Sequence, residues 1–169
     1  MGIGTSFAQI VAEELDVPLE SVIIRMGDTA TTVDQRGTAS SNGIIQGGAA
    51  LKKAGAEARR ALMAMAAERL AVPVDQLTVN DGVVSVSNEP ARFVSYGALI
   101  GDKQFELNLS GKAEPKPTSR YKLVGKPIPR LDIPAKVTGS YAYLVDFKLP
   151  EPKVDSAAAG FAKSVLSRL

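Results

Sequence analysis

The sequence predicts an α+β fold: two helix–strand units with a β-hairpin and an extended C-terminal tail. Apolar residues at helical spacing run up to two Val-Pro pairs, Val17-Pro18 and Val72-Pro73. The order of residues 12–24 (a helix end, a Val-Pro break and a strand pattern) recurs in residues 67–79, at an offset of 55. An Asp-Gly pair at Asp81-Gly82 separates two short β-branched runs and indicates a tight hairpin turn. Two such units do not make a solenoid, which needs at least three.

The first unit begins with a helix. Ser6 and Gln9 have the spacing of a capping box, and apolar residues follow at helical spacing as far as Leu15. Pro18 should end the helix, because the residue before a proline avoids the α region. The run Val22-Ile23-Ile24 then predicts a buried strand.

A long loop is predicted over residues 27–43, which have little periodicity and many turn formers. A loop of that length inside a compact domain is usually functional. Its end, residues 37–43, is rich in Gly, Ser, Thr and Asn and runs into a helical pattern. These residues either cap that helix or offer amides and hydroxyls to a phosphate. The sequence has neither a P-loop nor a Rossmann fingerprint, since Gly-Lys-Ser/Thr is absent and Gly2-x-Gly4 is not followed by the third glycine in register.

A second helix is predicted over about residues 46–70. Its apolar stripe consists of Leu51, Ala54, Ala58, Leu62 and Met65. Gly47-Gly48 at its start either permits close packing or lets the helix terminus approach a ligand. The sequence then predicts residues 77–79 and 83–86 as the two strands of the hairpin. Further along, the patterns predict a helix at 94–100, a strand at 105–109, a linker at 111–119, a strand at 136–147 and a helix at 155–169.

Composition excludes several classes of site. The 169 residues contain neither Cys nor His. Disulfides, thiolate nucleophiles, Ser-His-Asp triads and Cys- or His-ligated metals are therefore excluded. Asp and Glu form no recognisable ligand set, so no catalytic residue and no metal ligand is predicted. The net charge of +2 and the aromatic content of 5% do not favour nucleic-acid binding. No apolar run approaches transmembrane length, and no signal peptide is recognisable.

Several segments, taken in order, carry a resemblance to a known family. They are Gly2-Ile3-Gly4, Ala12-Glu13-Glu14-Leu15-Asp16-Val17-Pro18, Met26-Gly27-Asp28-Thr29-Ala30, residues 37–42, Leu123-Val124-Gly125-Lys126-Pro127 and residues 130–139. Together they resemble the molybdopterin-binding large (beta) subunit of the xanthine dehydrogenase/aldehyde oxidase family, of the isoquinoline 1-oxidoreductase or aldehyde dehydrogenase type. The resemblance covers about residues 1–150.

The resemblance implies a piece of a molybdenum hydroxylase that holds part of a molybdopterin dinucleotide for the oxidation of aldehydes or N-heterocycles. It implies cofactor contacts through Gly2, Gly37, Thr38, Ala39, Ser40, Asn42 and Gly43. The family's catalytic glutamate matches no residue here, so the chain alone should be inactive and should not retain the cofactor. The alternative is a non-catalytic α/β binding or interaction module that has lost the cofactor; a flavin or nucleotide phosphate site is a third option.

The resemblance also implies an organisation and partners. Residues 1–110 would be a partial cofactor-binding domain, residues 111–135 a linker, and residues 136–169 the start of a truncated hammerhead-like domain with an unrelated C-terminal helix. The expected partners are an iron–sulfur subunit or the remaining segments of the large subunit. Self-association is expected, because helices built to cover a larger sheet leave an apolar face exposed. The expected location is the cytoplasm, although members of the family are also periplasmic.

Overall fold

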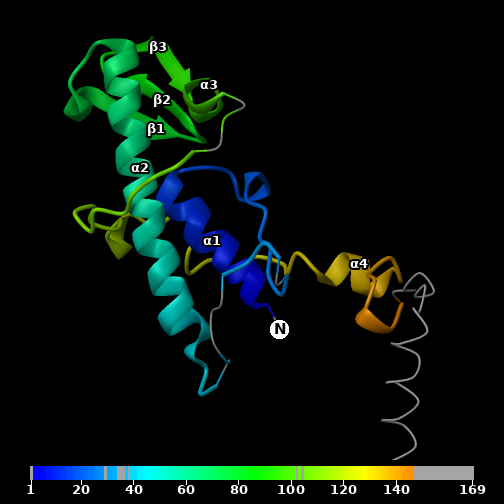
Figure 1. The fold of residues 1–169 in the computed structure, drawn as a ribbon. Helices are drawn as coiled ribbons and strands as arrows, with labels where there is room; N and C mark the ends of the chain where they lie inside the picture. Colours follow the sequence, from blue (N-terminus) through cyan, green and yellow to red (C-terminus); the bar gives the residue numbers. More distant parts are fainter. Residues whose placement is uncertain are drawn as a thin grey trace, which may run out of the picture. The chain divides into compact units, whose positions relative to one another are not determined.

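The computed structural model describes residues 2–28, 30–33, 37, 39–101, 103 and 105–146. The chain divides into two compact units, Met1–Leu131 and Asp132–Leu169. The first unit is built on two helices, α1 (Ile3–Leu15) and α2 (Ala49–Leu70), with a small sheet beside the second half of α2 (Figure 1). The predicted α+β class and the predicted long second helix are confirmed.

Glycines allow α1 and α2 to pack closely. The helix α2 is preceded without a break by a π-helical turn, Gly43–Gly48. Each glycine of the π-helical turn and of α2 faces a residue of α1. The pairs, in order, are Gly43 with Ile3, Gly47 with Phe7, Gly48 with Ile10 and Gly55 with Glu14. Positions rise together along both helices, so the two helices run in the same direction and begin at the same end. Gly47-Gly48 therefore serves helix packing, the first of its two predicted roles.

This close approach shifts the buried face of α2 from the predicted stripe. Of the five predicted positions only Leu62 is buried, and the others are half-buried. The buried positions are Gly55, Ala56, Glu57, Leu62, Met63 and Ala66. The pattern missed this face because Gly55, which has no side chain to score as apolar, faces α1. A Cβ at Gly55 would lie 2.9 Å from the Cβ of Glu14.

The internal repeat predicted at the two Val-Pro pairs is present in the backbone. Asp16 and Ala71 end their helices in the left-handed conformation, each with φ of 53°. Val17 donates to the carbonyl oxygen of Ala12, and Val72 to that of Ala67, both at 3.1 Å, as in a Schellman cap. A single 3₁₀ turn follows each proline, at residues 19–21 and 74–76.

After the second repeat the chain enters the sheet, whereas after the first it does not. The predicted strand at Val22-Ile23-Ile24 is wrong: no strand is assigned there among the described residues. Val22 and Ile24 pack onto a small cluster around Ala8 and Leu19, while Ile23 is 81% exposed. The segment has the half-buried alternation of a strand, but a strand also needs a hydrogen-bonding neighbour, and the described part of the chain supplies none.

The sheet has three antiparallel strands in the order β1-β2-β3. They are β1 (Leu77–Asn80), β2 (Val83–Val86) and β3 (Glu89–Ser95). The predicted hairpin is confirmed; Asp81 and Gly82 have φ of 49° and 73°, as a two-residue turn of the primed type requires. The helix predicted over 94–100 begins later, as α3 (Tyr96–Ile100), because Val94 and Ser95 still belong to β3.

The main core lies between the sheet and the second half of α2. From α2 it takes Leu62, Met63 and Ala66, and from the sheet and α3 it takes Leu77, Val84, Val86, Val94 and Tyr96. The turn of the hairpin is also tied to α1, because Gly82 donates a 2.7 Å hydrogen bond to the carbonyl oxygen of Asp16. The C-terminal half of α2, the sheet and the end of α1 therefore form one packed body.

Buried carboxylates hold residues 110–131 against the two helices. Ala113 donates its backbone N–H to Glu57 at 3.1 Å, and Lys116 donates its backbone N–H to Glu14 at 2.9 Å. Residues 111–131 of the linker expected over 111–135 thus lie on α1 and α2 within the first unit. The strand predicted at 105–109 is not formed, since no strand lies beside these residues in the part of the chain that the structure describes.

The described residues of the second unit, Asp132–Asp146, contain the short helix α4 (Ile133–Val137) and a 3₁₀ turn at Leu144–Asp146. The strand predicted from residue 136 is therefore wrong for its described part. Pro134 sits in the first turn, where a missing N–H costs nothing, and Lys136 pairs with Asp132 at 2.6 Å. The predicted helix at 155–169 lies outside the described residues.

Candidate functional site

The candidate site lies where the two parallel helices begin. In the part of the chain that the structure describes, neither helix start has a side-chain cap: Gly2 precedes α1, and Asn42 precedes the π-helical turn. A Cβ at Gly43 would overlap the side chain of Ile3, so the two starts adjoin. Each helix terminus carries a partial positive charge of about half a unit, together with unsatisfied N–H groups. Two parallel termini side by side repel one another and favour an anion between them.

The loop before the π-helical turn is shaped by its own Asn. The Oδ1 of Asn42 accepts the backbone N–H of Ala39 at 3.2 Å, and the N–H of Asn42 donates to the carbonyl oxygen of Ala39 at 3.0 Å. Ser40 and Ser41 between them are exposed and have φ of 48° and 58°, in the left-handed region. Non-glycine residues adopt that conformation at a cost of about 1–2 kcal/mol each, so the loop stores backbone strain.

The sequence-predicted site residues are brought together only in part. Gly2 and Gly43 lie at the joined helix starts, and Ala39, Ser40 and Asn42 form the exposed loop that leads into them. Gly37 is exposed, and a Cβ there would meet nothing within 4 Å, so glycine is not sterically required. Thr38 lies outside the described residues.

Arg130 is not among the site residues predicted from the sequence. Its side chain passes over the start of α1, since a Cβ at Gly2 would lie 3.1 Å from the Cδ of Arg130. The next residue is anchored there too, because Leu131 donates its backbone N–H to the hydroxyl of buried Thr5 at 3.0 Å. A guanidinium at a helix start adds positive charge to an anion site. In the sequence, only the position of Arg130 inside residues 130–139, which resemble the family, could have indicated that it contributes charge to an anion site.

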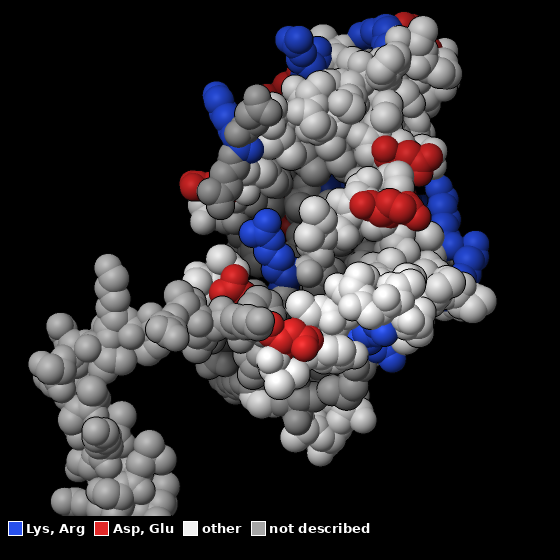
Figure 2. Space-filling model, turned by 90° about the vertical axis from the view of Figure 1, so that its right-hand side faces the viewer, with Lys and Arg blue, Asp and Glu red and all other residues white. Residues whose placement is uncertain are grey.

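The described residues hold no group of three or more Asp or Glu side chains that could bind a metal ion. Asp28, in the loop before the site, has a structural role. Thr31 donates its hydroxyl to Asp28 at 2.7 Å and Ala30 its backbone N–H at 2.9 Å, and these hydrogen bonds lower the pKa of Asp28. Figure 2 shows acidic and basic side chains interspersed on the face that it presents.

The sequence model of one family, described as "Molybdopterin cofactor-binding domain", matches residues 1–148. The chain belongs to this family. The helix starts and the loop described above lie inside the matched region, as does Arg130. Among the described residues, no helix is long and apolar enough to span a membrane.

Curated relatives come from several bacteria. The chain is 41% identical over 149 residues to a subunit of nicotinate dehydrogenase from Pseudomonas putida and covers 12% of that protein. It is 30% identical over 188 residues to the beta subunit of isoquinoline 1-oxidoreductase from Brevundimonas diminuta and covers 24% of it. The match takes in 88% of this chain in both cases. The chain thus spans a quarter or less of the length of these relatives.

A solved structure also resembles the chain. Reconstituted CO dehydrogenase from Oligotropha carboxidovorans superposes with a TM-score of 0.51 and 29% sequence identity. The match covers 57% of this chain and 12% of that chain. A similar backbone arrangement therefore recurs inside a much larger chain.

Proposed function

We propose that this chain forms part of the molybdopterin-cofactor site of a molybdenum hydroxylase and holds the phosphate-bearing part of a molybdopterin dinucleotide. One observation carries the proposal: two parallel helices start side by side without side-chain caps. Amide donors and aligned helix dipoles are what a pyrophosphate group needs. The residues present therefore fit the anionic part of such a cofactor.

Each residue at the helix starts has a distinct role in this proposal. The amides after Gly2 and those of Ser40, Ser41 and Gly43 donate to phosphate oxygens, with Arg130 supplying a full positive charge. Asn42 is a positioning residue, since its side chain is engaged in shaping the loop. Thr38 and Gly37 are retained as contacts on the resemblance alone. The cofactor, when bound, supplies the redox chemistry, while the residues of this chain bind and orient it.

The names of the relatives support a substrate class for the enzyme of which this chain would be part. Nicotinate and isoquinoline are N-heterocycles, and a third relative, 29% identical, is a membrane-bound aldehyde dehydrogenase of Gluconacetobacter polyoxogenes. We propose oxidation of an N-heterocycle or an aldehyde, with an iron–sulfur subunit as electron acceptor. No residue of this chain is assigned a catalytic role, so the chain alone should show no turnover.

Self-association is proposed through the unpaired extended segment at residues 22–26. Ile23 is 81% exposed and Met26 is 47% exposed on a segment without a strand partner among the described residues. Such an edge pairs readily with another strand. Sedimentation should show a dimer at micromolar concentration that the Ile23→Lys variant abolishes; a monomer at all concentrations would contradict this part of the proposal.

The cofactor proposal is tested with pyrophosphate as the probe. Backbone amide shifts of the 169-residue chain should change saturably at residues 3–5 and 40–44, with a Kd of roughly 1 mM, because only part of the site is present. Arg130→Gln should weaken binding by about threefold to tenfold. Arg69→Gln, at an exposed cation at the far end of α2, is the matched control and should change nothing. Absence of saturable shifts, or shifts confined to other residues, would overturn the proposal.

A further inference from the structure

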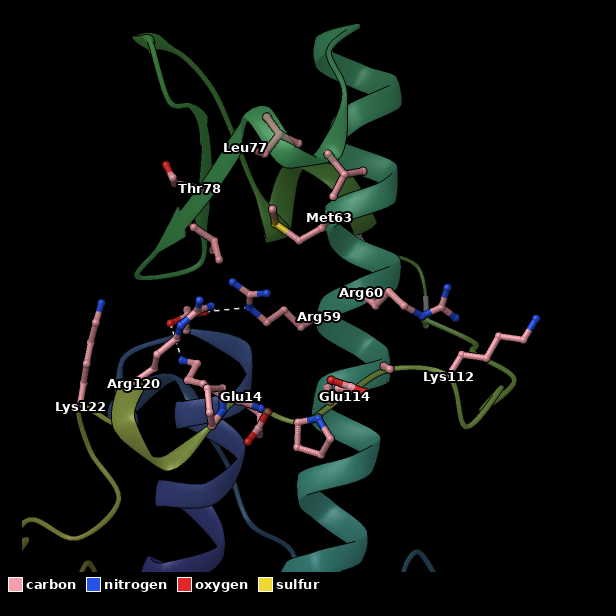
Figure 3. A pocket seen from close by; sticks show the side chains of 18 residues that line it. Glu14, Arg59, Arg60, Met63, Leu77, Thr78, Lys112, Glu114, Arg120 and Lys122 are labelled. Carbon is pink, nitrogen blue, oxygen red and sulfur yellow. Dashed lines mark hydrogen bonds and ion pairs between the residues drawn. The ribbon is translucent and has the colours of Figure 1, made fainter.

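A second pocket lies away from the helix starts. It occupies about 1000 Å³ between β1, the middle of α2 and residues 112–122 (Figure 3). Arg59, on its α2 side, is ten residues into the helix, which is about 15 Å along the axis at 1.5 Å per residue. The pocket is therefore a separate place from the helix starts.

The pocket carries excess positive charge. Six of its lining side chains are Lys or Arg and three are Asp or Glu. Arg59 on α2 and Arg120 on the opposite wall point toward one another across it, and Lys122 lies beside Arg120 (Figure 3). Like charges facing each other favour an anion between them.

Carboxylates balance only some of these cations: Glu57 pairs with Arg60 at 3.0 Å, and Glu13 pairs with Lys116 at 3.3 Å. Asp16 accepts the Nε of Arg59 at 2.8 Å and the Nζ of Lys116 at 2.6 Å, so one carboxylate already serves two cations. Among the described residues, neither the terminal nitrogens of Arg59 nor the side chain of Arg120 makes a hydrogen bond. Lys122 has only a 3.4 Å contact with the side-chain oxygen of Asn80. Three cationic groups thus have donors available for a ligand.

The same pocket is bordered by a free sheet edge. The strand β1 lies at one end of the order β1-β2-β3, on the side of the sheet nearest α1 (Figure 1). Asn80 and Val83 flank the two-residue turn and are therefore a hydrogen-bonded pair. Because such pairs alternate, the N–H and C=O of Val79 point away from β2, along the free edge of the sheet, and Val79 also lines the pocket.

The upper wall of the pocket is apolar. Met63, Leu77 and Val79 line it beside the free edge. A small inorganic anion would use the cations and leave both this wall and the backbone of Val79 unpaired. An extended peptide would contact the cations, the apolar wall and the free strand edge together. Its backbone pairs with the edge, alternate side chains cover the wall, and the remaining side chains reach the cations.

We propose that this pocket binds an extended acidic segment of another protein chain, which pairs with β1 as a fourth strand and directs its carboxylates to Arg59, Arg120 and Lys122. Charge complementarity selects the occupant. A second copy of this chain is disfavoured, because two positively charged pockets would repel one another.

The test uses a labelled hexapeptide, acetyl-VEVEVD-amide, and the full 169-residue chain, with binding followed by fluorescence anisotropy. The Arg120→Gln/Lys122→Gln double variant should weaken binding at least tenfold. Lys53→Gln/Arg69→Gln removes two exposed α2 cations outside the pocket and is the matched control, which should change affinity less than twofold. The neutral peptide acetyl-VQVQVN-amide should also bind at least tenfold more weakly.

Strand pairing is tested separately from charge. Methylating alternate backbone nitrogens of the peptide keeps its charge but blocks pairing, and should weaken binding at least tenfold. Val79→Pro should do the same while keeping the fold, since the N–H that it removes is unpaired. Equal binding of the methylated peptide, or full competition by pyrophosphate, would replace this proposal with a small-anion site. No peptide binding, or a dimer of the chain that Val79→Pro dissociates, would also overturn it.

Discussion

The Oε2 atom of Glu13 lies 2.6 Å from the backbone nitrogen of Leu123, which donates a hydrogen bond to it. The same oxygen accepts the N–H groups of Lys122 at 2.8 Å and Val124 at 3.0 Å. Burial opposes ionisation of Glu13, but these three backbone hydrogen bonds outweigh it and hold its pKa below the ordinary value. A buried, ionised carboxylate on α1 therefore secures the segment that follows residue 120.

Glu13→Gln should destabilise the chain by about 2 kcal/mol at neutral pH, because charge-assisted hydrogen bonds are lost and an amide cannot accept on both sides. Urea unfolding measures the loss. Glu14→Gln should cost less than half as much, since Glu14 accepts one backbone N–H and burial raises its pKa. Exposed Glu20→Gln is the control and should have no effect. Equal losses at Glu13 and Glu14 would contradict this assignment.

Stability should fall in acid. The pKa of Glu57 is lowered to about 2, mainly by the N–H of Ala113, and that of Glu13 is lowered as well. A depressed carboxyl pKa adds stability that is complete above the unfolded value of 4.5 and is lost as pH falls through the folded pKa. Glu14, whose pKa is raised, opposes this trend but is one group against three, because the pKa of Asp28 is lowered too.

The free energy of unfolding should therefore decrease from about pH 5 to about pH 2. The Glu57→Gln variant should show a shallower decrease over the same range, because it removes one of the three carboxyl groups whose pKa is lowered. Denaturant titrations at several pH values measure both curves. Parallel curves for the two proteins would show that Glu57 does not contribute to the pH dependence.

Gly55→Ala should destabilise the chain by about 1–3 kcal/mol, although alanine is the better helix former. The added Cβ would lie 2.9 Å from the Cβ of Glu14, and close packing of the two helices cannot accommodate it. Gly97→Ala in α3 is the matched control, because its Cβ would meet only the hydroxyl of Ser95 at 3.9 Å. That variant should be neutral or stabilising by up to about 1 kcal/mol. Thermal unfolding of both distinguishes packing from helix propensity.

Ala71→Gly should stabilise the chain by about 0.5–1 kcal/mol, since glycine adopts the left-handed cap of α2 without strain. Asp16→Gly offers the same relief at the end of α1 but removes the ion pairs to Arg59 and Lys116. It should therefore be destabilising. A lower melting temperature for Ala71→Gly would be inconsistent with a strained cap.

Local features could be predicted from the sequence because they depend on neighbours along the chain. The Asp81-Gly82 turn and the two Val-Pro helix ends each involve only a few consecutive residues. The strand expected at residues 22–24 failed because pairing depends on a distant neighbour that the pattern cannot reveal. The strand β3 was missed because its burial begins only at Val94, so its outer half shows no alternation.

The candidate site could also be predicted only in part. The loop at residues 39–43 stands out by composition, and the structure places it at a helix start. Arg130 could not be predicted from local pattern, because it reaches Gly2 only through the return of the chain along α1. The role of Gly43 in packing against Ile3 was likewise invisible before both helices were placed together.

The hydrogen bonds of Glu13 also set an order of folding events. The hairpin and the two helix ends close over a few residues, whereas Lys122 and Glu13 are 109 residues apart in sequence. The entropy cost of closing a loop grows with the logarithm of that separation, so the local elements form first and residues 110–131 pack onto the helices afterwards. Because ionised carboxylates hold residues 110–131 in place, acid should release this segment before the sheet opens. Hydrogen exchange would then reveal two cooperative units within the first 131 residues.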